Sequence, residues 1–115
     1  MKNTIRLSAV LLATTVLPVA AQSDVRMGER LYQENCASCH GANLEGQLDW
    51  RSRLPNGRLP APPHDASGHT WHHPDRVLFD IVKRGPAAIV GNGYESDMPG
   101  YEDVLTDDEI TAIID

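Results

Sequence analysis

Three residues of this 115-residue chain have the types and the spacing of a cofactor attachment site. Cys36, Cys39 and His40 form the pattern C-x-x-C-H. Two thiols three positions apart can form thioether bonds with the two vinyl groups of a haem, and the histidine that follows can place its imidazole beside the iron. The pattern therefore predicts one covalently bound haem c, attached through Cys36 and Cys39 and ligated by His40.

Other chemistries use similar residues. A thioredoxin-like C-x-x-C site would follow a strand, and no strand pattern precedes Cys36. A disulfide between residues so close in sequence would close a very short loop and stabilise the fold little. A zinc site would need further ligands, which His64, His69, His72 and His73 could supply. Haem attachment is favoured because it accounts for both cysteines and the adjacent histidine.

The sixth iron ligand must come from elsewhere in the chain. After residue 21 the sequence has two methionines, Met27 and Met98. Met27 lies nine positions before Cys36 and would be held on the proximal side. Met98 lies among Asp, Pro and Gly residues, which are not typical of a core segment. A thioether opposite an imidazole favours Fe(II) and raises the reduction potential. Met98 is the expected ligand, and a bis-histidine site that uses one of the four other histidines is the alternative.

Three helices are expected to position these residues. The first runs from about Asp24, as its N-cap, to about Asn35. The second opens at Pro74, which suits the first helical position, and ends before Gly85. The third starts with a capping box over residues 106–109 and carries isoleucines on one face. No stretch alternates cleanly enough for a strand, so we expect no sheet.

Two long stretches, residues 41–73 and 85–105, are expected to be irregular because they hold most of the Gly and Pro residues. Loops longer than about 12–15 residues are uncommon in compact domains unless a functional element organises them. The first stretch contains apolar and aromatic side chains, including Trp50 and Trp71. These side chains favour a loop that wraps around a large ligand, rather than a disordered segment.

The first 21 residues have the features of a secretory signal peptide. Lys2 and Arg6 precede an apolar run of thirteen residues, and small residues then allow cleavage after Ala21. Such a run is too short for a membrane-spanning helix, which needs about 20 residues; a short uncleaved anchor is the alternative. We expect residues 22–115 to form one domain with no membrane span, exported to the periplasm.

The chain is acidic, with a net charge of −6. It has no cluster of Lys and Arg, which excludes nucleic-acid binding as the expected function. Its hydrophobic content of 41% is too high for a disordered chain. An acidic surface predicts redox partners that present a positive patch, with association that slows as salt rises.

The chain resembles a small class I c-type cytochrome of the bacterial type. The resemblance rests on residues 36–41, on Gly28 followed by Leu31-Tyr32, and on Asp97-Met98-Pro99, and it covers about residues 24–115. It implies an all-α fold of three to four short helices and long loops, wrapped around one covalently bound haem. It also implies that His40 and Met98 are the axial ligands.

The resemblance implies roles for further residues. In this family a backbone carbonyl, usually that of a proline, accepts the free N–H of the proximal imidazole. Pro62 or Pro63 would serve, and Pro62 is preferred. Trp71, Tyr94 or Arg58 would contact a haem propionate.

The last helix departs from the family pattern, in which the first and last helices cross with a glycine against an aromatic residue. Gly28 is present, but no aromatic residue follows position 106. The helix spans only about nine residues and ends at Asp115, where the helix dipole favours a basic residue. We expect either that the sequence is truncated or that this crossing is weak, with fraying of residues 110–115.

Together these features predict an exported monohaem electron carrier rather than an enzyme, acting as a monomer. No substrate atom would be transformed, because the iron alternates between Fe(II) and Fe(III). Two alternatives remain: a haem-bearing redox subunit of a larger respiratory or dehydrogenase complex, and a haem protein with a bis-histidine or open site for gas or peroxide chemistry. Metal handling by the four other histidines, alongside the haem, is a third.

Overall fold

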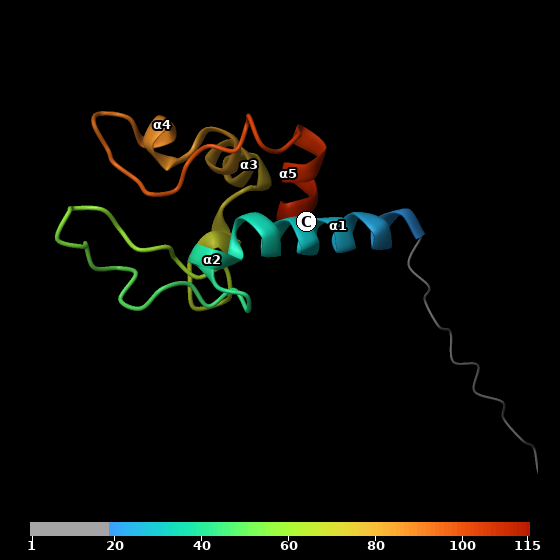
Figure 1. Ribbon diagram of the computed structural model, residues 1–115, viewed down its shortest axis with the longest axis horizontal. Coiled ribbons are helices and arrows are strands. Elements are labelled where there is room, and N and C mark those ends of the chain that lie inside the picture. The colour runs from blue at the N-terminus through green and yellow to red at the C-terminus, as the bar shows by residue number, and fades with distance from the viewer. Residues whose placement is uncertain (1–18) are drawn as a thin grey trace, which may run out of the picture.

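The computed structural model describes residues 19–115, and the side chains of residues 24–115. Within this range the chain forms helices and loops without a strand (Figure 1), which confirms the all-α fold class. No helix in this range is long and apolar enough to cross a membrane. The expected signal peptide lies almost entirely outside the described residues. The elements are α1 (Val19–Asn35), α2 (Ala37–His40), the 3₁₀-helix η1 (Thr70–His72), α3 (Asp75–Arg84), α4 (Pro86–Val90) and α5 (Asp107–Ile114).

Two of the expected helix starts were wrong. α1 begins at Val19, so Asp24 lies inside the helix instead of capping it. The residues before Asp24 include two alanines, the strongest helix formers, and they extend the helix toward the N-terminus. α3 begins at Asp75 because Pro74 is its N-cap, with an extended ψ of 145°, and not its first helical residue.

A short helix, α4, lies inside the stretch 85–105 that was expected to be irregular. It begins with Pro86 at its first position, and glycines with positive φ stand on both sides of it, Gly85 at 81° and Gly91 at 68°. Proline at the start and glycine after the end are ordinary helix boundaries. The signal was therefore present in the sequence, but the five-residue length hid it.

The capping box of α5 is confirmed. The Thr106 hydroxyl accepts a hydrogen bond from the Glu109 backbone N–H at 3.3 Å, and the Glu109 carboxylate accepts one from the Thr106 N–H at 2.9 Å. These two bonds satisfy N–H groups that the first turn of a helix leaves without partners. They fix where α5 starts and thereby which of its faces meets α1.

The core lies where α1 crosses α5 and α3 packs beside them (Figure 1). At the crossing, a Cβ built on Gly28 would overlap the backbone carbonyl of Ala112, so the two helices approach backbone to backbone. Ile110 is completely buried beside Leu31 and Leu105. Half-buried side chains pack around these three: Met27, Phe79, Val82, Tyr101, Ile113 and Ile114. The crossing thus forms with Gly28 against a helix backbone, without an aromatic residue on α5.

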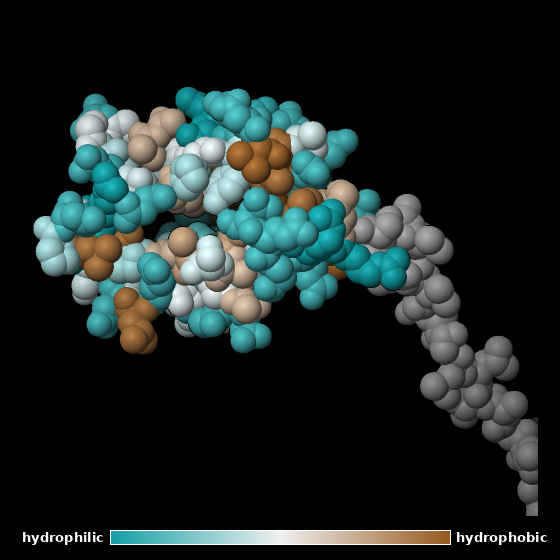
Figure 2. All heavy atoms as spheres, viewed as in Figure 1, coloured by the Kyte–Doolittle hydropathy of each residue, from teal (hydrophilic) through white to brown (hydrophobic). Residues whose placement is uncertain are grey.

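Two loops extend from this helical part toward the same side of the molecule. One follows α2 and the other follows α4, and Figure 1 shows them lying opposite each other at the left. Figure 2 shows that the surface is hollowed between them, above the position of α2. Lys83 and Asp107 form an ion pair of 2.7 Å that ties α3 to the start of α5. The loops therefore project from a framework of packed helices.

Replacing Gly28 with alanine should destabilise the protein, because the added methyl group overlaps a helix backbone that can move only if α1 and α5 separate. Overpacking of this kind costs about 1–3 kcal/mol or more of unfolding free energy. Denaturant unfolding measures the loss. Glu29→Ala, at the exposed neighbouring position of the same helix, is the control and should change stability by less than about 0.5 kcal/mol. A Gly28→Ala protein as stable as the wild type would contradict this packing.

Candidate functional site

The C-x-x-C-H segment continues directly from the end of α1. The Cys36 N–H donates to the Tyr32 carbonyl at 2.8 Å, and the His40 N–H donates to the Cys36 carbonyl at 2.9 Å. Cys36 separates the two helices as the N-cap of α2, and the helical turn that follows places Cys36 and Cys39 about one turn apart on the same side. Both are free thiols, Cys36 half-buried and Cys39 exposed, so they do not form the disulfide considered above.

Two tyrosine hydroxyl groups hold the ends of this segment. Tyr101 donates to the Asn35 carbonyl, just before Cys36, and Tyr32 donates to the Gly41 carbonyl, just after His40, each at 3.0 Å. Burial raises the pKa of Tyr32 to about 12, and it also raises the pKa of Tyr101, so both hydroxyls keep their protons and act as donors. Sequence reasoning missed this role, because the order of residues does not show which carbonyl a distant hydroxyl reaches.

His40 is buried, with only 7% of its surface exposed. Its Nδ1 lies 2.8 Å from the carbonyl oxygen of Pro62, so the N–H at Nδ1 donates to that carbonyl and Nε2 carries the free lone pair. Burial lowers the pKa of His40, an effect that the bond to Pro62 partly opposes. A neutral imidazole fixed at one nitrogen is the form that ligates a metal through the other. The carbonyl of Pro63 faces Thr70 instead, whose hydroxyl lies 3.5 Å away.

The four other histidines do not form a single cluster. His64 stacks on His40, with ring centroids 4.0 Å apart, and burial lowers the pKa of His64 to about 4. His69, His72 and His73 form a separate group with ring centroids 5.3–6.0 Å apart. No three or more His, Cys, Asp or Glu side chains of the described residues are placed to hold a metal ion together. This counts against the zinc site considered above.

The two methionines have different surroundings. Met27 packs against the core residues of α1 and α5. Met98 lies in the loop after α4, half-buried, and its backbone N–H donates to the Ser96 hydroxyl at 3.1 Å. This loop is one of the two that border the hollow in Figure 2. Met27 thus packs as a core residue, and ligation by Met98 stays a prediction.

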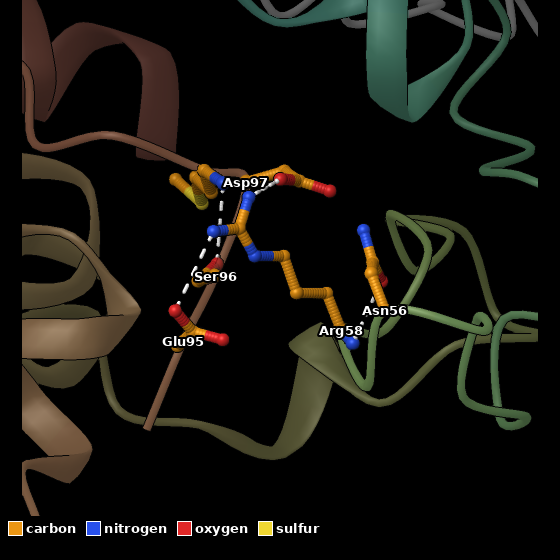
Figure 3. A network of polar contacts seen from close by, with 6 residues as sticks. Asn56, Arg58, Glu95, Ser96 and Asp97 are labelled. Atoms are coloured by element: carbon orange, nitrogen blue, oxygen red, sulfur yellow. Dashed lines mark hydrogen bonds and ion pairs between the residues drawn. The ribbon is translucent and has the colours of Figure 1, made fainter. Parts of the chain in front are cut away.

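The three residues expected at a haem propionate are placed differently from one another. Trp71 is 71% exposed, and its indole N–H donates to the Gly68 carbonyl at 3.1 Å. The guanidinium of Arg58 is paired with the carboxylates of the loop that carries Met98 (Figure 3). Tyr94 is half-buried in that same loop. A propionate contact by any of the three stays a prediction.

Comparison with known proteins gives the family. The family described as "Cytochrome C oxidase, cbb3-type, subunit III" matches residues 23–115. Cytochrome c-555 of Prosthecochloris aestuarii is 31% identical over 70 residues, which is 56% of this chain and 71% of that protein. The chain belongs to the cytochrome c family. The resemblance noted in the sequence is therefore confirmed at the level of the family.

Other relatives match over a shorter length. The cytochrome c subunits of the cytochrome bc1 complex from Mycobacterium bovis and Mycobacterium tuberculosis are 46% identical over 46 residues. This match covers 37% of the cytochrome chain and 16% of each subunit, so the chain spans only a small part of these relatives. No solved structure gives a significant match.

A c-type cytochrome carries covalently bound haem c, and the residues of this chain fit such a group. Two free cysteines and a buried imidazole with an unused nitrogen supply the donors. Helix α3 carries apolar side chains that are only half-buried and do not pack against the core cluster, as expected for side chains that line a large apolar group: Val77, Leu78 and Ile81.

Removing either hydroxyl that holds the C-x-x-C-H segment should destabilise the cytochrome. Tyr32→Phe and Tyr101→Phe each remove one hydrogen bond and leave a carbonyl with one partner fewer, which costs about 1 kcal/mol of unfolding free energy. Glu29→Ala is the control, because Glu29 is exposed on the same helix as Tyr32 and has no role in the site. Equal stability of all three variants in denaturant unfolding would show that the two hydroxyls do not hold the segment.

Proposed function

We propose that this cytochrome is an exported monohaem electron carrier, in which Cys36 and Cys39 hold the haem and His40 and Met98 ligate its iron. The observation that carries this proposal is the buried imidazole of His40, held through Nδ1 by the Pro62 carbonyl and placed directly after two free cysteines. The two cysteines are the only ones in the chain, so they provide for one haem. Bound haem supplies one-electron chemistry.

The residues of the chain would set the conditions of electron transfer. The Pro62 carbonyl fixes the orientation of the His40 ring and raises the basicity of its free nitrogen. The Met98 thioether favours Fe(II) over Fe(III) and so raises the reduction potential. The low exposure of His40 excludes water from the proximal side, which helps to keep the electrostatic surroundings constant.

Charge and sequence support the remaining parts of the proposal. Lys2, Arg6 and the apolar run that follows support export to the periplasm through a cleaved signal peptide. The net charge of −6 supports docking to partners with a positive patch, through electrostatic steering that salt weakens.

A second candidate function is that of a haem-bearing redox subunit within a larger complex. It is favoured by the 46-residue match to subunits that are named as parts of a cytochrome bc1 complex. A carrier that works alone should migrate as a monomer after extraction from its native cells. Migration of the native protein as part of a large complex would support the second candidate.

Covalent attachment can be tested by acid extraction of protein that has been produced with haem-maturation machinery. The pigment should stay with the denatured polypeptide of the wild type, because thioether bonds survive unfolding. The double variant Cys36→Ala/Cys39→Ala should lose its pigment to the organic phase. Ser38→Ala, between the two cysteines, is the control and should keep its pigment. Loss of the pigment from the wild type would refute the attachment.

Ligation by Met98 can be tested by comparison of two methionine variants. Met98→Ala should remove the weak red absorption band of sulfur ligation from the ferric spectrum and lower the reduction potential, because the soft ligand of Fe(II) is lost. Met27→Leu conserves core volume and should keep both the band and the potential. A ferric spectrum and a potential that do not change in Met98→Ala would assign the sixth position to another ligand.

A further inference from the structure

An arginine joins the two loops that border the hollow. Arg58, in the loop after α2, lies with Nη1 2.5 Å from a carboxylate oxygen of Asp97 and with Nη2 3.7 Å from one of Glu95. Both carboxylates belong to the loop that carries Met98. Figure 3 shows the guanidinium reaching between them from the facing loop. The contact with Asp97 spans 39 residues of sequence, so these ion pairs connect separate parts of the chain.

The backbone of Arg58 is held in place on its own side. Its N–H donates to the side-chain oxygen of Asn56 at 3.0 Å, and its carbonyl accepts from the Leu54 N–H at 2.8 Å. Farther back, Gln47 and Ala61 exchange two hydrogen bonds of 2.9 and 2.8 Å, which close the base of the loop. The guanidinium therefore extends from a loop that is ordered by its own hydrogen bonds.

The segment around Met98 is fixed differently on its two sides. On the C-terminal side, the N–H groups of Tyr101 and Glu102 donate to carbonyls at the end of α3, at 3.0 and 3.1 Å. A Cβ built on Gly100 would lie 2.7 Å from the Arg84 carbonyl carbon, so the backbones are in contact there. On the N-terminal side, Arg58 ties residues 95–97 to a distant segment through its ion pairs. No other hydrogen bond or ion pair within residues 24–115 does so.

We propose that Arg58 is a positioning residue that keeps the loop of Met98 closed against the loop after α2 and so holds the thioether at the iron. The inference rests on the proposed function, in which Met98 is the sixth ligand. Its physical basis is a guanidinium shared by two carboxylates that would repel each other without it. The Arg58 side chain is 35% exposed, so the contribution of the ion pairs is modest and salt screens it.

The test is a titration of the ferric holoprotein with imidazole, which competes with the Met98 thioether for the iron. The apparent affinity of the protein for imidazole rises with the fraction of molecules in which the Met98 thioether has left the iron. Arg58→Ala should bind imidazole about two- to fivefold more tightly than the wild type, the range that corresponds to exposed ion pairs. Arg76→Ala, which removes an exposed arginine of α3 that has no ion pair within residues 24–115, should leave the affinity unchanged.

Salt and a charge exchange show whether the ion pair itself is responsible. The wild type should bind imidazole more tightly as salt rises to about 1 M, where screening is nearly complete, while Arg58→Ala should change little. The double variant Arg58→Asp/Asp97→Arg should restore most of the wild-type affinity. Equal salt dependence of the wild type and Arg58→Ala would overturn the proposal.

A further pair of measurements separates this proposal from the proposed function and from a general loss of stability. In Met98→Ala the imidazole affinity should rise strongly, and adding Arg58→Ala should then have no effect. If Met98→Ala raises the affinity and Arg58→Ala does not, Met98 is a ligand but the role of Arg58 is refuted. If Met98→Ala has no effect, ligation by Met98 fails.

Hydrogen exchange in Arg58→Ala should quicken at residues 95–98 and stay unchanged at Ile110; faster exchange at both would indicate general destabilisation and overturn the proposal.

Discussion

The backbone approach of Gly28 to Ala112 is the contact on which the rest of the structure depends. It sets the crossing of α1 and α5, and α1 ends directly before Cys36, which caps the short helix α2 that carries His40. One turn after Gly28, Tyr32 bonds the far end of the C-x-x-C-H segment, while Tyr101, just before α5, bonds its near end. The helix crossing thus positions the two thiols. It also positions the two tyrosine hydroxyl groups that hold the ends of the C-x-x-C-H segment.

Polar contacts, rather than a large core, organise the two loops. Ile110 is the one completely buried large side chain of the described residues, and the apolar residues of α3 are only half-buried. The bond from His40 to Pro62 joins the loop after α2 to the framework, and the ion pairs of Arg58 join the two loops to each other. Such an arrangement suits a family whose members fold around a large apolar cofactor, since the cofactor supplies the buried area that the side chains do not.

Burial gives the site a different electrostatic character from the surface. Desolvation lowers the pKa values of His40 and His64 and raises that of Tyr32, so all three groups are held in their neutral forms. The surface carries the net negative charge of the chain. A neutral interior and an acidic exterior separate the two requirements of a redox protein, which are stable ligation inside and recognition by charge outside.

The sequence by itself determined the elements whose signals are local. The C-x-x-C-H site of Cys36, Cys39 and His40 and the capping box at Thr106 could be predicted, because each depends on residues within one or two helical turns. No segment has a strand pattern, and the described residues form no strand. The start of α1 and the short α4 were missed, because the residues before Asp24 favour a helix without an apolar period and because five residues are too few to show one. Only the tertiary structure decided that His64 separates from the other histidines and that Arg58 reaches Asp97. These contacts join residues far apart in the chain, and loop paths that no repeating pattern encodes bring them together.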